Sequence, residues 1–198
     1  MMRQLTIVTL VILVLAAGAV SAAEETTRTT RGKPALLVMD IQNIWLPMMD
    51  DEGKEEALWY VNYAISKFRE RGLPIIVVYH SDSTHGPEPG TEAFEFSGEI
   101  KISDDDIKVV KSHPSAFTET ELEEILRREG CDTVFLVGLS AVGCVLRTHF
   151  DAERLGFQPF MIEGALLSHD TDLTRAVEEI TGAVRPGNLA YMILNAPN

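Results

Sequence analysis

The chain has 198 residues, of which 45% are hydrophobic, and a formal net charge of −13 at pH 7. This length suffices for one domain with a substantial core and is too short for two domains of ordinary size. The negative charge argues against nucleic acid and anionic membrane surfaces as partners, because both are bound through basic patches.

The N-terminus has the pattern of a secretory signal. One arginine, Arg3, precedes a long apolar stretch that ends in small residues around Ser21–Ala23. We therefore expect residues 1–23 to be a signal peptide, residues 24–33 to be a polar lead-in, and the protein to be secreted or periplasmic. The alternative is a membrane anchor formed by residues 5–20, whose length approaches that of a membrane span.

From residue 34 onward, short apolar runs alternate with amphipathic stretches. The apolar runs predict strands at ALLVMD (35–40), PIIVVYH (74–80), IKVVK (107–111), DTVFLVG (132–138), PFMIEG (159–164) and NLAYMIL (188–194). Helices are predicted around Leu58–Phe68 and at 122–130, 142–156 and about 172–183. Strands that alternate with helices pair in parallel through right-handed crossovers. Residues 34–198 should therefore form one α/β domain, a three-layer α/β/α sandwich with a mostly parallel, Rossmann-like sheet of about six strands.

Residues able to do chemistry follow several of these strands directly. Asp40, His80, Lys111 and the turn Gly138–Cys144 all stand at strand ends, and a long loop over 81–106 lies between two of the strands. In parallel sheets, ligands bind beyond the carboxyl ends of the strands, and long loops there are commonly functional. We expect these residues to meet at one edge of the sheet and the loop to cover that edge.

Cys144 is the candidate nucleophile in this group. A helix N-terminus and a nearby lysine both stabilise a thiolate, which is the reactive form of cysteine, so we expect its pKa to be lowered. A carboxylate such as Asp40 can accept the thiol proton and return it to a leaving amine. The alternative is an inert core thiol, since free cysteine is among the most buried residues. Cys131, at the other end of a strand about 20 Å long, is too far away to bridge Cys144 and is interpreted as structural.

Three segments, LLVMDIQN, VVKSHPSAF and GLSAVGCVLRTHFDA, resemble signature segments of the isochorismatase-like cysteine hydrolases, which include nicotinamidases and N-carbamoylsarcosine amidases. The resemblance implies a triad of Asp40, Lys111 and Cys144. It also implies a cis peptide bond between Leu139 and Ser140, with the backbone N–H groups of Ser140 and Cys144 as oxyanion donors. The implied activity is cleavage of a C–N bond in a small amide, carbamoyl or ureido substrate through a thioester. No organic cofactor is implied, the only other partner is the chain itself in a homo-oligomer, and no membrane contact is expected beyond the N-terminal signal.

The chain departs from the family pattern near the expected substrate pocket. It has Ala141 where many members have Thr, and His113-Pro114 where many have Arg-Tyr, so no particular substrate can be carried over. The nicotinamidase metal pattern Asp-x-His is also missing, although His80, Asp82 and His85 lie close together in sequence; no metal is predicted. The candidates for lining the pocket are Gln42, Trp45, His113, Phe117 and Ala141.

Two rival functions remain open. Ser140, Asp151 and His169 occur in the order of a serine esterase triad, but Val142 occupies the place of the second glycine of a G-x-S-x-G elbow. The other rival is a non-catalytic binding or scaffold protein with the same fold. Replacing Ser140 and Cys144 separately distinguishes the esterase from the cysteine hydrolase.

Overall fold

The computed structural model describes residues 32–84 and 86–196. The predicted signal peptide, its membrane-anchor alternative and most of the predicted lead-in lie outside these residues, as does His85. In the part of the chain described, no helix is both long and apolar enough to cross a membrane.

Five parallel strands form the central sheet, in the order β3-β2-β1-β4-β5. Each is a run rich in apolar and β-branched residues, as the strands of a parallel sheet covered on both faces are. Their bounds are β1 Lys33–Met39, β2 Ile75–His80, β3 Ile107–Lys111, β4 Cys131–Leu139 and β5 Gln158–Leu167.

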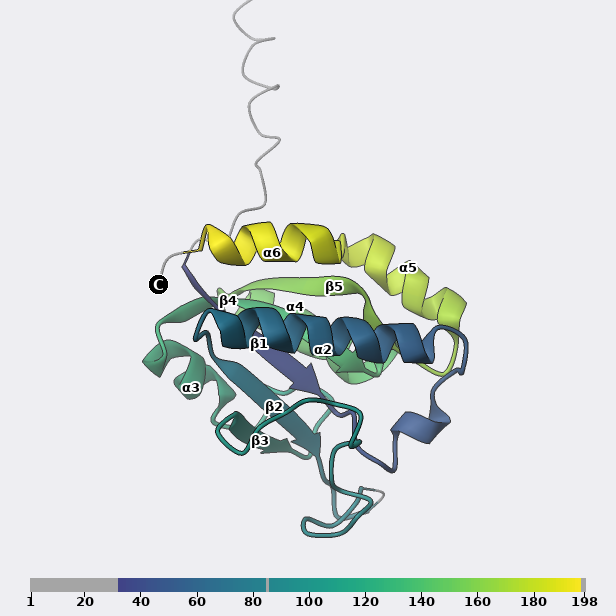
Figure 1. Cartoon of the computed structure of the whole chain (residues 1–198). Coiled ribbons are helices and arrows are strands. Elements are labelled where there is room, and N and C mark those ends of the chain that lie inside the picture. The colour runs from purple at the N-terminus through teal and green to yellow at the C-terminus, as the bar shows by residue number, and fades with distance from the viewer. Residues whose placement is uncertain (1–31, 85, 197–198) are drawn as a thin grey trace, which may run out of the picture.

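Helices cover both faces of the sheet (Figure 1). Along β1, Leu36 and Val38 face one hydrophobic cluster, while Leu37 and Met39 face the other. The helices and helical turns are η1 Leu46–Met48, α2 Lys54–Glu70, α3 Leu122–Arg128, η2 Ala141–Val145, α4 Leu146–Arg154, α5 Thr171–Thr181 and α6 Pro186–Leu194. The first cluster contains the apolar faces of α2 and α6, and the second those of α3 and α4 together with Val177 of α5. The α/β class and the layered parallel sheet are thus confirmed.

The sixth predicted strand, 188–194, is wrong. Pro186 begins the helix α6 instead, because a proline fits the first turn of a helix, where its missing N–H is not needed. Leu189, Met192 and Ile193 then fall on one buried side, at the i, i+3, i+4 spacing of a helix. The described sheet accordingly has five strands, all parallel, rather than about six.

The helix predicted over 142–156 begins later than expected. Residues Ala141–Val145 form a wide π-helical turn, in which Gly143 has φ −121° and ψ −106°, outside the helical region. The regular helix α4 starts only at Leu146. Cys144 therefore lies in the turn before α4 and not inside its first turn.

The long loop between β2 and β3 is packed into the protein. Phe94, Phe96 and Ile100 belong to the first hydrophobic cluster, and the rings of Phe94 and Phe96 lie against Tyr79 at centroid distances of 4.9 and 4.6 Å. The Gln42 side chain ties the loop to the segment after β1, because its amide N–H donates to the carbonyl oxygen of Phe94. This part of the loop is therefore packed into the core beside β2.

Candidate active site

Asp40 follows β1 directly and has an unusual backbone conformation. Its φ is 55°, in the left-handed region that non-glycine residues seldom adopt, although Asp and Asn tolerate it best. Its backbone N–H donates to Val78 O at 2.9 Å, so the chain is still held by β2 at this point. The residue is only 2% exposed, so the local backbone directs a carboxylate into the interior at the sheet edge.

The end of β4 brings the other side of the site against β1. Gly138 has φ 112°, and a Cβ at this position would lie 2.2 Å from Met39 O, so only glycine allows the two strands to approach this closely. The peptide bond between Leu139 and Ser140 is cis, as the resemblance implies. The turn η2 follows and carries Cys144.

Lys111 connects the acid and the thiol. Its Nζ lies 2.9 Å from Asp40 Oδ2 and 3.2 Å from Cys144 Sγ. The lysine is the last residue of β3, and its side chain is fully buried. Asp40, Lys111 and Cys144 come from three separate strand ends, and the fold brings all three together as predicted from the strand pattern.

Burial governs the protonation of the acid and the thiol. Desolvation raises the pKa of the Asp40 carboxyl, and the attraction of Lys111 only partly opposes this. Desolvation, followed by the negative charge of Asp40, raises the pKa of the Cys144 thiol to about 11, while Lys111 acts to lower it. The expectation of a lowered thiol pKa is therefore wrong, because it weighed the lysine and the helix but not the burial of the sulfur. One lysine cation balances one anion, so the buried site favours keeping one proton on the acid–thiol pair.

The sequence of the chain matches the isochorismatase domain over residues 34–181. The chain belongs to the isochorismatase family. Among its relatives, the isochorismatase family protein YrdC of Bacillus subtilis is 29% identical over 140 residues, which cover 67% of this chain and 73% of YrdC. The secreted isochorismatase effector Isc1 of Verticillium dahliae is 30% identical over 112 residues, 56% of this chain and 59% of Isc1. The solved structure of N-carbamoylsarcosine amidase from Thermoplasma acidophilum superimposes with a TM-score of 0.65 at 30% identity and covers 77% of this chain and 95% of that one.

Two of the predicted pocket residues of this isochorismatase-family protein are fully buried. Ala141 packs in the second hydrophobic cluster. The Gln42 side chain accepts a hydrogen bond from the His80 N–H at 2.8 Å and donates to His80 O at 3.1 Å and to Phe94 O at 2.8 Å. All the observed contacts of the Gln42 side chain are thus with backbone, which fits a residue that fixes the end of β2.

The other three pocket candidates are partly exposed. Trp45 meets the His80 ring edge-on at 5.9 Å, and its buried indole N–H has no hydrogen-bond partner among the described residues. His113 Nε2 lies 3.1 Å from Glu119 Oε2, and Phe117 stacks on Phe157. Of these three residues, Trp45 is the one that contacts His80, which in turn contacts Lys111.

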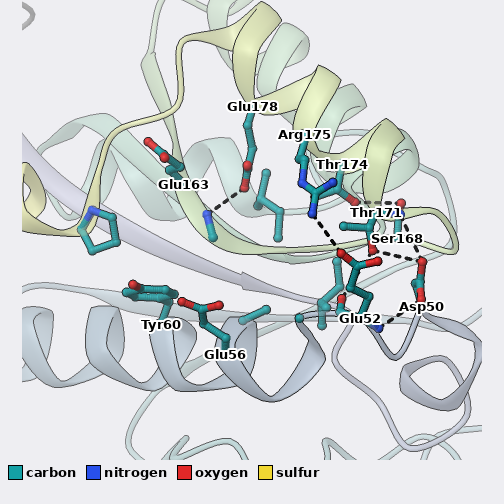
Figure 2. A pocket seen from close by; sticks show the side chains of 16 residues that line it. Asp50, Glu52, Glu56, Tyr60, Glu163, Ser168, Thr171, Thr174, Arg175 and Glu178 are labelled. Atoms are coloured by element: carbon teal, nitrogen blue, oxygen red, sulfur yellow. Dashed lines mark hydrogen bonds and ion pairs between the residues drawn. The ribbon is translucent and has the colours of Figure 1, made fainter.

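Two cavities bear on where a ligand could bind. One, of about 380 Å3, lies over η2 and the start of α4 and is lined by Pro114, Val142, Gly143, Leu146, Arg147 and Phe150. The other, of about 420 Å3, lies between α2, β5 and α5 and is rich in carboxylates; Glu52 there pairs with Arg175 at 3.0 Å (Figure 2). Asp40, Lys111 and Cys144 line neither cavity; the first is lined by Gly143, the residue that precedes Cys144 in the chain.

The esterase arrangement finds no support in the contacts of Asp151. This carboxylate pairs with Arg154 on its own helix at 3.2 Å, and a hydrogen bond from Ser115 lowers its pKa. His169 is exposed just after β5. Asp151 is therefore already engaged with neighbours other than the histidine that it would have to orient.

Sequence reasoning placed His80 at a strand end but gave it no function. In the structure, His80 Nδ1 lies 2.9 Å from Lys111 Nζ and His80 Nε2 lies 3.0 Å from Asp82 Oδ2. Knowledge of the register between β2 and β3 would have predicted this contact, because His80 of β2 pairs directly with Lys111 of β3.

Proposed function

We propose that this chain is an exported amidohydrolase that cleaves a C–N bond of a small amide, carbamoyl or ureido substrate through a thioester on Cys144. One observation carries the proposal. A buried lysine ammonium lies within contact distance of both a carboxylate and a thiol, at 2.9 Å from Asp40 Oδ2 and 3.2 Å from Cys144 Sγ. A nucleophile, a proton acceptor and a fixed cation are the groups that acyl transfer needs.

The first step is a proton transfer inside the site. Asp40 takes the proton from Cys144 as the sulfur attacks the substrate carbonyl, and Lys111 stabilises the thiolate as it forms. The carbonyl oxygen becomes an oxyanion, for which the backbone N–H groups of Ser140 and Cys144 are the proposed donors. The raised pKa values of Asp40 and Cys144 support this order of events, because a buried pair that keeps one proton can pass it between its members without exchanging it with water.

Departure of the amine uses this proton, and hydrolysis of the thioester uses a proton from water. Asp40 returns it to the nitrogen as the C–N bond breaks, and ammonia or an amine leaves while the acyl group stays on sulfur as a thioester. Asp40 then removes a proton from a water molecule that attacks the thioester. As the C–S bond breaks and the acid product leaves, Asp40 gives this proton to the sulfur and regenerates the Cys144 thiol.

The substrate should be small and should approach over η2. The cavity over η2, which is lined by Gly143 and not by Cys144 itself, holds about 380 Å3, at the lower end of the volumes of ligand pockets. The relative from Thermoplasma acidophilum is by name an N-carbamoylsarcosine amidase, and another from Pseudomonas putida, 32% identical over 76 residues, is by name a maleamate amidohydrolase. These names support amides, carbamoyl compounds and ureides as the panel to screen.

The test is release of ammonia or amine from such a panel by the wild type and by two variants. Cys144→Ala should lower the rate by about a thousandfold or more, because the nucleophile is lost. Ser140→Ala should retain activity, since Ser140 contributes only its backbone. The proposal fails if no member of the panel is hydrolysed or if Cys144→Ala is fully active. Absence of hydrolysis would support the non-catalytic binding protein. Loss of activity in Ser140→Ala but not in Cys144→Ala would support the esterase.

We further propose export and self-association. The N-terminal signal pattern and the secreted relative Isc1 support export. N-terminal sequencing of protein recovered outside the cytoplasm should start near Ala23 or Glu24, and light scattering should give a mass that is a multiple of one chain. Recovery of the intact N-terminus in the membrane fraction would favour the anchor formed by residues 5–20.

A further inference from the structure

His80 is held firmly beside the lysine of the site. As the last residue of β2 it lies in register with Lys111 of β3. The Gln42 amide binds both its backbone N–H and its carbonyl oxygen, so the main chain is fixed where the ring begins. The Trp45 ring meets the imidazole edge-on from one side. The imidazole is thus set with Nδ1 toward Lys111 and Nε2 toward Asp82.

Counting hydrogen atoms fixes the tautomer of His80. A lysine ammonium has three N–H donors and no acceptor. The Lys111 Nζ lies near three acceptors, Asp40 Oδ2 at 2.9 Å, Cys144 Sγ at 3.2 Å and His80 Nδ1 at 2.9 Å. His80 Nδ1 can accept only if its ring proton is on Nε2, and this proton then points to Asp82 Oδ2 at 3.0 Å.

Asp82 is itself oriented by the loop that follows β2. Its Oδ1 accepts a hydrogen bond from the Thr84 N–H at 2.8 Å, which leaves Oδ2 facing His80. A carboxylate can only accept hydrogen bonds, so it selects the His80 tautomer that carries the proton on Nε2. Asp82, His80 and Lys111 therefore form a chain of hydrogen bonds that ends at the thiol.

We propose that His80 and Asp82 are positioning residues for Lys111: Asp82 sets the tautomer of His80, and His80 Nδ1 accepts the third proton of the ammonium and so keeps it aimed at Asp40 and Cys144. This inference rests on the proposed function, in which Lys111 stabilises the thiolate. Neither residue touches the reacting atoms. With the opposite tautomer, an N–H of His80 would face an N–H of Lys111, and the buried ammonium would turn away from the sulfur.

A pair of variants of equal size tests His80. The side chain introduced by His80→Asn carries an oxygen near the place of Nδ1 and can still accept from Lys111, whereas the side chain introduced by His80→Leu has the same size and no acceptor. The readout is the rate of alkylation of Cys144 by iodoacetamide from pH 7 to 10, followed by mass spectrometry in a Cys131→Ser background. We expect about tenfold slower alkylation in His80→Leu, because a hydrogen bond to a charged group is lost, and a nearly wild-type rate in His80→Asn. Equal rates in His80→Leu and the wild type, or equally slow rates in both variants, would overturn the inference.

Asp82→Asn tests the tautomer itself. Its amide oxygen keeps the hydrogen bond to the Thr84 N–H, which directs the NH2 group at His80 Nε2 and forces the ring proton onto Nδ1. Alkylation should slow in Asp82→Asn but should not slow further when Asp82→Asn is added to His80→Asn, which has no tautomer to set. An equal additional loss in the double variant would mean that Asp82 only supports the loop, and the inference would fail.

The two proposals fail in different ways. Alkylation of Cys144 needs no substrate and can be measured whether or not the protein hydrolyses amides. If the His80 and Asp82 variants change the alkylation rate as expected but no amide is hydrolysed, only the proposed function is refuted. A protein that hydrolyses amides with unchanged turnover in His80→Leu refutes the positioning role alone. Circular dichroism and thermal melting of each variant establish that it is folded before its rate is compared.

Discussion

Replacing Asp40 by Asn separates the reactivity of the thiol from catalysis. The negative charge of Asp40 is one of the causes that raise the pKa of Cys144, second only to desolvation. Asn removes this charge, so the thiolate, once it forms, is the anion that balances Lys111. Asn also tolerates the left-handed conformation that Asp40 adopts at φ 55°, so the backbone should be kept.

The size of the effect follows from the geometry. Asp40 and Cys144 lie within hydrogen-bonding reach of each other, so their charges are roughly 4 Å apart; at an effective dielectric constant of about 20 their repulsion is about 4 kcal/mol. This corresponds to a fall of roughly three units in the thiol pKa. The wild-type pKa is about 11, because burial and the carboxylate outweigh the lysine. We therefore expect the pKa of the Cys144 thiol to be about 8 in Asp40→Asn.

The assay is the pH profile of iodoacetamide alkylation of Cys144 in a Cys131→Ser background. The midpoint should fall in Asp40→Asn, while hydrolysis of any substrate is lost because no group accepts and returns the proton. Asp151→Asn is the matched control, since Asp151 pairs with Arg154 and should leave the midpoint unchanged. A midpoint in Asp40→Asn that stays or rises would refute the charge reasoning on which the site is built.

Two further predictions concern stability. Gly138→Ala should lower the free energy of unfolding by about 3 kcal/mol, because the new Cβ would lie 2.2 Å from Met39 O at a φ of 112°. The control Gly72→Ala, at φ 61° with open space around it, should lower it by only about 1 kcal/mol. Equal losses of the two variants in urea unfolding would contradict the proposed clash. Glu178→Gln should raise the melting temperature by about 2 °C at pH 7, because desolvation raises the pKa of Glu178 and its ionisation therefore opposes folding. Folded Glu178 keeps its proton to a higher pH than Glu178 in the unfolded chain, so the native protein loses stability as pH rises from the unfolded to the folded pKa. The advantage of Gln should vanish near pH ~4, where Glu178 is largely protonated in both the folded and the unfolded protein. A gain in melting temperature that persists at that pH would show that the charge of Glu178 is not its cause.

Local sequence patterns predicted most of the strands and helices and the meeting of Asp40, Lys111 and Cys144. The strand IKVVK was predicted with the same bounds that the structure shows, because a β-branched run has a clear local signal. Asp40, Lys111 and Cys144 were predicted to meet because the carboxyl ends of parallel strands share one edge, a rule that needs only the order of strands. NLAYMIL was assigned wrongly because an apolar run of this length fits a strand or a buried helix. Pro186 just before it and the helical spacing of Leu189, Met192 and Ile193 are the local signals that favour the helix.

What the sequence could not give depends on contacts between distant segments. The partnership of His80 with Lys111 requires the register of β2 against β3, which side-chain packing sets over the whole sheet. The pKa of Cys144 depends on how completely the sulfur is desolvated, and no motif encodes that quantity. The helix N-terminus and the lysine are visible in the sequence, so they led to an expected shift of the wrong sign.

The raised pKa of the thiol bears on the kind of reaction the site can perform. A thiol whose pKa is about 11 in the resting protein is not a standing thiolate, so it should react slowly with electrophiles that offer no place for its proton. An amide or ureide offers such a place, because its leaving nitrogen must be protonated. Attack by sulfur and departure of nitrogen are then joined by one proton carried on Asp40, while the charge of Lys111 stays constant. The burial that makes the Cys144 thiol less reactive in general thus favours substrates with a basic leaving group. The leaving oxygen of an ester needs the proton less, so this site should accelerate the hydrolysis of esters less than that of amides of equal size.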